Sequence, residues 1–378
     1  MRKLAWFAAA FSAAAALAVH GLPEGVLVPL GVACALAALA GLALRGDRRR
    51  RVLLAGFGLA AGLLWTAAYG ALFQAPARAL AGYEGPVEVT VADWPQATAY
   101  GSSVLVRLHP VEGWPVRTLL YLDAPAPDLR PGDGLTVQAR LRAADTITGE
   151  STDYYYAKGV RLIAYGEGEG ETARPGRPPL WTWPAYVSKA LKDRVAAAFP
   201  EEAAPLVTAL LTGDRSGLSD GDYAALRQSG LAHVIAVSGL HVSFLAGLAA
   251  ALLGARRRRT AVCTIALLVC FAAVVGNTPS VLRAVFMQSM LLLAPLLGRE
   301  EDKPTSLCAV LMLLLLQNPY AAASVSLQLS FAAVAGIYLF SGPLTERWTA
   351  RLPARPKGFW AKTGCLAARF VLSSLAVS

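Results

Sequence analysis

The sequence predicts a mostly α-helical polytopic membrane protein with an inserted extracytoplasmic small β-barrel domain. Three observations support this fold class. Apolar residues make up 55% of the 378 residues and charged residues only 16%, whereas soluble globular chains usually carry about 25% charged residues. Long apolar segments occur in two groups. The region between the groups consists of short β-branched runs separated by turn residues.

The first group, within residues 1–75, contains three segments that can cross a bilayer. They are Leu4–Val19, Val26–Leu44 and Val52–Phe73, and a membrane helix needs about 20 predominantly apolar residues. The basic run 45–51 separates the second segment from the third. We interpret the first segment as a span rather than a signal peptide, because more spans and no polar domain follow it.

Residues 83–172 predict a small β-barrel or sandwich, with an OB-like barrel as one option. Five runs have the length and composition of strands: Pro86–Val91, Ser103–Leu108, Val116–Leu122, Gly134–Arg142 and Val160–Tyr165. Residues 131–134, Pro-Gly-Asp-Gly, are typical of a tight turn.

Residues 173–202 are predicted to form a linker and an amphipathic helix. The Gly/Pro/Glu-rich stretch Gly166–Pro179 favours a linker, beginning where the last strand ends. Trp181–Phe199 has a polar face with three basic residues. This helix can either lie along the membrane surface or pack as an ordinary soluble helix, and the pattern does not distinguish the two.

Residues 203–378 predict a second helical membrane region of about five to six spans. The candidates are Leu231–Leu253, Ala261–Val275, Val281–Leu297, Leu307–Leu316 and Val325–Phe340. The last stretch, Gly364–Ser378, is apolar but short for a span, so we expect the chain to be a fragment of a longer protein or a short form.

The distribution of charge indicates how the chain is oriented. The net charge is +10, but residues 84–177 carry 9 Lys/Arg and 13 Asp/Glu, a net of −4. The excess of positive charge therefore lies in short runs between apolar segments, which is the positive-inside pattern of plasma membrane proteins and not in itself a nucleic-acid footprint. It predicts a cytoplasmic N-terminus and an extracytoplasmic β-domain.

Two histidines interrupt the first predicted span of the second group. His233 and His241 are eight residues apart, which places them about 80° apart around a regular helix. They could bind a metal ion, or Ser238 and His241 could act as nucleophile and base of an intramembrane hydrolase. No carboxylate or cysteine lies near in sequence to complete either site. We favour hydrogen bonding between helices, and we predict no metal, no cofactor and no catalytic residue.

Arg283 lies early in a later apolar segment, after Thr278-Pro279-Ser280. It could line a pore and meet phosphate groups. It could equally extend its guanidinium to the lipid headgroups. The five cysteines lie in or beside apolar segments, so the sequence predicts no disulfide framework.

The segment Leu210–Val242 resembles the ComEC family of competence proteins. It contains Gly213-Asp214 after an apolar run, and then Ser-Gly-Leu-x-His-x-x-Ala-Val-Ser-Gly-Leu-His-Val from residue 229. Further motifs of the family are matched by Pro279-Ser280-x-x-Arg283-Ala284, by Asn318-Pro319 and by Ser326-x-Gln328-Leu329-Ser330-Phe331. In the β-domain, Leu129-x-Pro131-Gly132-Asp133 and Asp153-Tyr154-x-Tyr156-x-x-x-Gly159-Val160 are similar to the family's OB-type domain.

This resemblance implies an inner-membrane channel that passes single-stranded DNA into the cytoplasm during natural transformation. Residues at matching positions become pore or structural candidates: Asp214, His233, Ser238, Gly239, His241, Arg283 and Gln328. Aromatic residues of the β-domain become candidates for stacking on DNA bases: Trp94, Tyr154, Tyr155 and Tyr156. The implied partners are single-stranded DNA, membrane lipid, a DNA receptor, a cytoplasmic helicase or translocase and a second copy of the chain.

Three other functions stay open at this point: a transporter or flippase for another anionic substrate, the intramembrane hydrolase described above, and a scaffold that recruits other uptake proteins. Many members of the family also carry a metallo-β-lactamase-like domain. This chain has four histidines and no His-x-His-x-Asp-His run, so the resemblance does not extend to that zinc chemistry.

Overall fold

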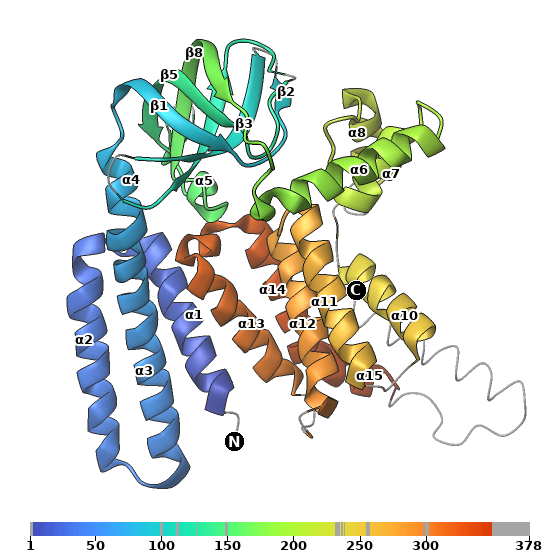
Figure 1. Ribbon diagram of the computed structural model, residues 1–378. Coiled ribbons are helices and arrows are strands. Elements are labelled where there is room, and N and C mark those ends of the chain that lie inside the picture. The colour runs from blue at the N-terminus through green and yellow to red at the C-terminus, as the bar shows by residue number, and fades with distance from the viewer. Residues whose placement is uncertain are drawn as a thin grey trace, which may run out of the picture.

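Figure 1 shows the computed structural model of the chain, in which a β-barrel stands over one end of a bundle of helices. The structure describes residues 3–349 except 99–100, 111–112, 127, 148–149, 231–234, 236, 238, 255–257, 297 and 299–301. The predicted fold class, a polytopic helical protein with an inserted OB-like barrel, is confirmed.

The N-terminal region forms three long helices that follow the three predicted spans. They are α1 (Lys3–Gly21), α2 (Glu24–Ala40, ending in the 3-10 turn η1, Gly41–Ala43) and α3 (Gly46–Tyr69). A π-helical turn, η2 (Gly70–Gln74), and the short α4 (Ala75–Ala79) continue α3 up to the barrel.

Two glycines bring α1 and α3 close together. A Cβ atom at Gly58 would lie 2.5 Å from the Phe7 carbonyl oxygen, and one at Gly62 would lie 2.4 Å from that of Phe11. Membrane helices associate through van der Waals packing, so small residues at the contact allow this approach.

Five strands close the barrel: β1 (Glu84–Val91), β3 (Gly101–Leu108), β4 (Val116–Leu122), β5 (Gly134–Ala143) and β8 (Leu162–Ala173). Around the ring, β1 pairs with β3, β3 with β4, β4 with β8, β8 with β5, and β5 with β1. Only β4 and β8 are parallel among these pairs. The short β2 (Gln96–Thr98) extends the sheet beside β3, and β6 (Thr146–Ile147) pairs with β7 (Glu150–Ser151).

Alternation of buried and outward-facing side chains along β3 and β4 builds the barrel core. Val104 and Val106 of β3, Leu120 of β4 and Leu162 of β8 have no exposed surface. Successive side chains of a strand point to opposite faces. The neighbours of these four residues along each strand therefore point outward, and some of them contact the membrane region.

The prediction of a linker beginning at Gly166 is wrong, because β8 continues to Ala173. Glycine is unfavourable in a strand unless another group approaches closely. Here a Cβ atom at Gly166 would lie 2.9 Å from Leu122 Cδ2, and one at Gly170 would lie 2.7 Å from Leu135 Cδ1. The glycines that suggested a linker are thus required for packing of β8 against its neighbours.

A group of short helices lies beside the barrel. The turn η3 (Leu180–Thr182) leads into α6 (Trp183–Ala198), the predicted amphipathic helix. α6 contacts α7 (Ala204–Thr212) and α11 (Arg258–Val275). The helix α8 (Asp220–Gln228) is polar and was not predicted. Its N-terminus is capped by Ser219, whose Oγ accepts a hydrogen bond from the Asp222 N–H at 3.1 Å.

The second membrane region comprises α10 (Gly239–Leu253), α11 (Arg258–Val275), α12 (Pro279–Leu296), α13 (Lys303–Gln317), the 3-10 turn η4 (Pro319–Ala323), α14 (Val325–Gly336), the π-helical turn η5 (Ile337–Ser341) and α15 (Gly342–Thr349). It packs against the first region, since Phe11 and Ala15 of α1 share a core with Val310 and Leu314 of α13. The predicted stretch 364–378 and most of residues 231–238 lie outside the described residues.

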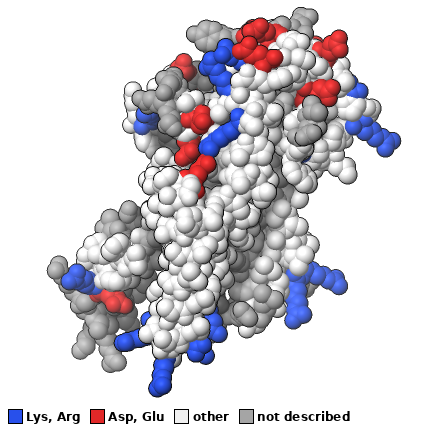
Figure 2. Space-filling view, turned by 90° about the vertical axis from the view of Figure 1, so that its left-hand side faces the viewer, with Lys and Arg blue, Asp and Glu red and all other residues white. Residues whose placement is uncertain are grey.

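The apolar surface of the bundle fits a bilayer. Within the described part of the chain, five helical segments are long and apolar enough to cross a membrane, and three further apolar helices are shorter. Figure 2 shows a broad band without charged side chains on the face seen from the left of Figure 1, with charges at the barrel and Lys/Arg at the opposite end. The chain is therefore a membrane protein with a polar domain at one end of its bundle.

Candidate functional site

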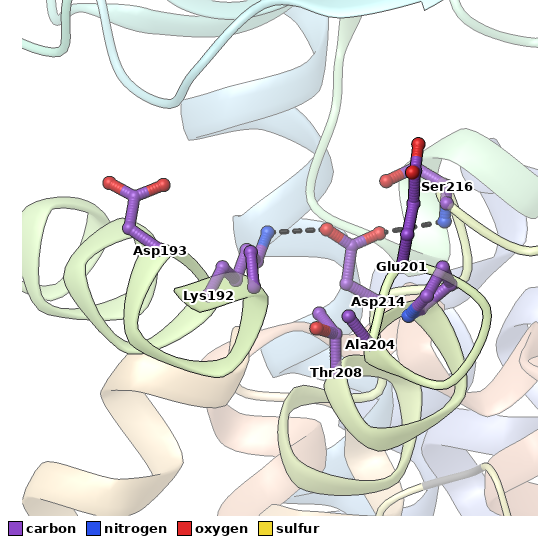
Figure 3. Close-up of a pocket in the computed structure, with 10 residues that line it drawn as sticks. Lys192, Asp193, Glu201, Ala204, Thr208, Asp214 and Ser216 are labelled. Atoms are coloured by element: carbon purple, nitrogen blue, oxygen red, sulfur yellow. Dashed lines mark hydrogen bonds and ion pairs between the residues drawn. The ribbon is translucent and has the colours of Figure 1, made fainter. Parts of the chain in front are cut away.

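Asp214 lies in a turn that α6 and α7 enclose. The turn begins at Gly213, whose φ of +76° ends α7 in the left-handed conformation that glycine tolerates. Lys192 of α6 forms an ion pair with Asp214 Oδ2, and the Ser216 N–H donates to Oδ1 at 3.0 Å. Figure 3 shows both contacts converging on the carboxylate.

These contacts keep Asp214 ionised. Burial alone would raise the pKa of Asp214, but the hydrogen bonds from Lys192 and Ser216 outweigh burial, so the pKa lies below its usual value. The carboxylate borders an open pocket of about 580 Å³ whose lining includes Glu201 and Thr208. The arrangement joins α6 to the turn before α8.

The motif around Gly239 lies where α10 meets α12. A Cβ atom at Gly239 would lie 3.7 Å from the Cβ atom of Ala284, the residue after Arg283. His241 is half-buried two residues further along α10. His233 and Ser238 lie outside the described residues, so the predicted pairings of these two residues with His241 stay predictions.

Arg283 joins two helices of the bundle. Its Nη1 donates to the Ser330 carbonyl oxygen of α14 at 2.7 Å, and its Cζ lies 6.0 Å from the centre of the Phe331 ring. Nε of Arg283 is buried and has no hydrogen-bond partner within the described residues. The guanidinium thus joins α12 to α14 in this structure, and its pore-lining role stays a prediction.

Gln328 lies near the start of α14, at the barrel end of the bundle. Its Nε2 donates to the Ala322 carbonyl oxygen at 2.8 Å and lies 3.2 Å from His20 Nε2. His20 Nε2 in turn lies 3.3 Å from the same carbonyl oxygen. The two side chains thus join the C-terminal end of α1 to η4, which brings the two membrane regions together.

Trp94 lies in the loop between the first and second strands of the barrel. Its Nε1 donates to the Ala185 carbonyl oxygen at 3.1 Å, and its ring contacts Tyr186 edge-on at 5.6 Å between centroids. Lys189 Nζ lies 5.2 Å from the centre of the same ring. Trp94 is half-buried and joins α6 to the barrel, and its stacking on a DNA base stays a prediction.

The three tyrosines lie in the loop between the fourth and fifth strands. In OB barrels, this loop and the loop between the first and second strands, which contains Trp94 here, bind oligonucleotides. Tyr154 is 49% exposed, Tyr155 is half-buried, and Tyr156 is 1% exposed. The Tyr156 ring packs against Tyr320 with centroids 5.6 Å apart. Tyr154 is the most exposed of the three, and Lys158 Nζ lies 4.1 Å from the centre of its ring.

The barrel is fastened to the bundle by residues that the sequence analysis did not single out as site residues. Asn318 Nδ2 donates to the Tyr156 carbonyl oxygen at 2.6 Å, and Asn318 Oδ1 accepts from the Tyr320 N–H at 3.1 Å. Burial raises the pKa of Tyr320 to about 12. The Asn-Pro motif thus has a visible role, which is to join η4 to the fourth-to-fifth strand loop.

The comparisons with known proteins agree with the resemblance found in the sequence. Residues 210–377 match the family described as Competence protein. A stretch of 145 residues, 38% of this chain, is 34% identical to ComE operon protein 3 of Bacillus subtilis strain 168 and covers 19% of that protein. The matched part is therefore about a fifth of the length of this relative. No solved structure matches. Among the described residues, no group of three or more His, Cys, Asp or Glu side chains could hold a metal ion.

Proposed function

We propose that this chain, whose second membrane region is similar to competence proteins, is a plasma membrane channel that passes single-stranded DNA into the cytoplasm. The similarity supports a part in competence DNA uptake. The observation that carries the finer proposal is the fastening of an OB-like barrel, through Asn318 and Tyr320, directly above that region. A barrel in this position can deliver a strand to the bundle without releasing it.

The orientation proposed for the chain follows from its basic loops. Arg45 and Arg48–Arg51 lie at the end of the bundle opposite the barrel, and Arg258 and Arg259 begin α11. Cytoplasmic loops carry an excess of Lys and Arg. We therefore place the N-terminus in the cytoplasm and the barrel outside, where DNA first arrives.

The proposed mechanism is passive conduction and involves no bond cleavage by this chain. Arg283 is a half-buried cation within the bundle, and a phosphate group would be held transiently by its guanidinium. A cytoplasmic helicase or translocase would supply the pulling force, and a DNA receptor would supply the strand. The competing proposal is a transporter for another anionic substrate, which would use the same cation.

The test is entry of labelled DNA into the cytoplasm, scored as label protected from external DNase. We expect protected label to vanish when the gene is deleted and to return when it is restored. Unchanged entry in the deletion strain would contradict the channel and favour the other transporter. We also expect Arg283→Ala to lower entry at unchanged membrane abundance, whereas a role limited to joining α12 and α14 predicts that abundance falls together with entry.

A further inference from the structure

Three arginines lie side by side on the outer face of the barrel. Arg107 of β3 is the direct cross-strand partner of Arg117 of β4. The Arg161 N–H donates to the Arg117 carbonyl oxygen at 3.0 Å, one residue before β8 begins. Residues directly before or after each of these arginines belong to the barrel core. Because successive side chains of a strand point to opposite faces, all three arginine side chains point outward. We call this set the arginine row.

The arginine row faces the junction between the barrel and the bundle. The Arg161 Cζ lies 4.9 Å from the centre of the Phe73 ring, and its Nη2 donates to the Tyr69 hydroxyl at 3.1 Å. Tyr69 ends α3, so one end of the row touches the top of a membrane span. At the other end, the Arg107 Cζ lies 3.8 Å from the centre of the Trp181 ring.

The charges of the row are not neutralised by the part of the chain that the structure describes. No carboxylate in that part forms an ion pair with any of the three side chains. Desolvation by the surrounding protein lowers the pKa of Arg117, repulsion from Arg107 and Arg161 lowers it further, and attraction to Asp93 acts in the opposite direction. Like charges directly opposite one another on neighbouring strands are destabilising, so an anion at the row would relieve this repulsion.

The chemistry of the row fits phosphodiester groups. Arg107 and Arg117 are exposed to water. A guanidinium stacked on a ring still presents N–H donors along its edge, in the geometry that matches phosphate oxygens. β3 and β4 are the second and third strands of the barrel, and this is the face on which OB barrels bind oligonucleotides. The overall charge of −4 in residues 84–177 therefore conceals a local cationic site.

We propose that Arg107, Arg117 and Arg161 form a binding site for consecutive phosphodiester groups of a single strand, at the place where the strand leaves the barrel for the bundle. The assignment of the phosphodiester to DNA rests on the proposed function. The same chemical group occurs in anionic phospholipids, and the junction lies close to the membrane surface, so the test separates the two sources.

The experiment measures binding of a fluorescent oligothymidylate to the full chain in phosphatidylcholine nanodiscs, over a series of salt concentrations. Neutralising a cation that contacts phosphate lowers the slope of log K against log salt by about 0.7 for a single strand. We expect Arg117→Gln to weaken binding about tenfold at low salt, the loss of one charge-assisted hydrogen bond, and to lower the slope by that amount. Arg117→Lys retains the charge and should keep the parent slope.

The matched control is Arg140→Gln, which removes the same charge from β5 of the same barrel, where Arg140 pairs with Glu84. It should leave the slope unchanged. The proposal is overturned if Arg117→Gln binds with the parent affinity and slope, or if it loses no more than Arg140→Gln. It is also overturned if Arg117→Gln binds the oligonucleotide normally but no longer enriches phosphatidylglycerol in mixed nanodiscs, because the row would then hold a lipid headgroup.

The outcome is independent of the uptake assay. If Arg117→Gln keeps the parent slope and DNA entry depends on the gene, the phosphodiester site at the arginine row is rejected and the channel proposal stands. If Arg117→Gln lowers the slope but DNA entry does not depend on the gene, the arginine row stands as a phosphodiester site and the channel proposal is rejected.

Discussion

Replacing Asn318 by Ala should release the barrel from the bundle while leaving both folded. The Asn318 side chain makes three hydrogen bonds. Its Nδ2 donates to the Tyr156 carbonyl oxygen at 2.6 Å and to the Ala157 carbonyl oxygen at 3.4 Å, and its Oδ1 accepts from the Tyr320 N–H at 3.1 Å. Tyr156 and Tyr320 are 1% and 8% exposed. Water therefore reaches neither group easily once the amide is gone.

The cost follows mainly from one group left unpaired. The Tyr320 N–H loses its acceptor, whereas the Tyr156 carbonyl oxygen still accepts from the Gly159 N–H at 2.9 Å. A buried donor without a partner costs about 1–3 kcal/mol, so we expect the closed arrangement to lose about that amount. Since about 1.4 kcal/mol corresponds to a factor of ten, the loop around Tyr156 should open about fivefold to 100-fold more often.

Hydrogen exchange of the full chain in detergent measures this opening, in peptides that cover residues 154–160. The control is Gln328→Ala, because Gln328 donates to Ala322 within the bundle and not to the barrel. Exchange in 154–160 should rise in Asn318→Ala and stay at the parent level in Gln328→Ala. Equal exchange in all three proteins would refute the reasoning that Asn318 fastens the barrel.

Two further predictions concern packing and charge. Gly62→Leu should strongly reduce the folded protein recovered in detergent, because α1 leaves no room for a side chain there. In the control Gly247→Leu on α10, a Cβ atom meets nothing within 4 Å, so the substitution should be tolerated. Equal recovery of the two variants would contradict this. Asp214→Asn should raise hydrogen exchange in α6 up to about fivefold, since a partly exposed ion pair contributes at most about 1 kcal/mol. The pKa of Asp214 lies below 3.8, so the contribution of its pair with Lys192 is complete above that pH and is lost only as pH falls further. A change in α6 exchange between about pH 5 and 8 that disappears in Asp214→Asn would argue against this.

Much of the fold could be predicted because length and periodicity are direct physical constraints. About 20 apolar residues are required to cross a bilayer, and α1, α2 and α3 follow such segments closely. The strand positions follow from alternation, and β4 coincides with its predicted range. The error at Gly166 arose because a glycine in a strand and a glycine in a linker look alike in sequence. Only the position of Leu122 distinguishes them.

The site was harder to predict, because its contacts join residues far apart in the chain. The resemblance identified Asn318-Pro319, Asp214 and Arg283 as motif positions but could not supply their partners. Asn318 and Tyr156 are separated by 162 residues, and Lys192 and Asp214 by 22. The arginine row could not be predicted from the sequence for a related reason, since only strand register brings its members together.

The central claim is that a single DNA strand passes the barrel and then the bundle. Position-specific photocrosslinking tests it most directly, with transported DNA stalled by a bulky group at its trailing end. A photoreactive phenylalanine replaces either Tyr154, which is 49% exposed on the barrel, or Val32, which is 46% exposed on the apolar face of α2. The account predicts crosslinks to DNA at Tyr154 and none at Val32. Equal labelling at both positions, or protected DNA that accumulates without a crosslink at Tyr154, would contradict it.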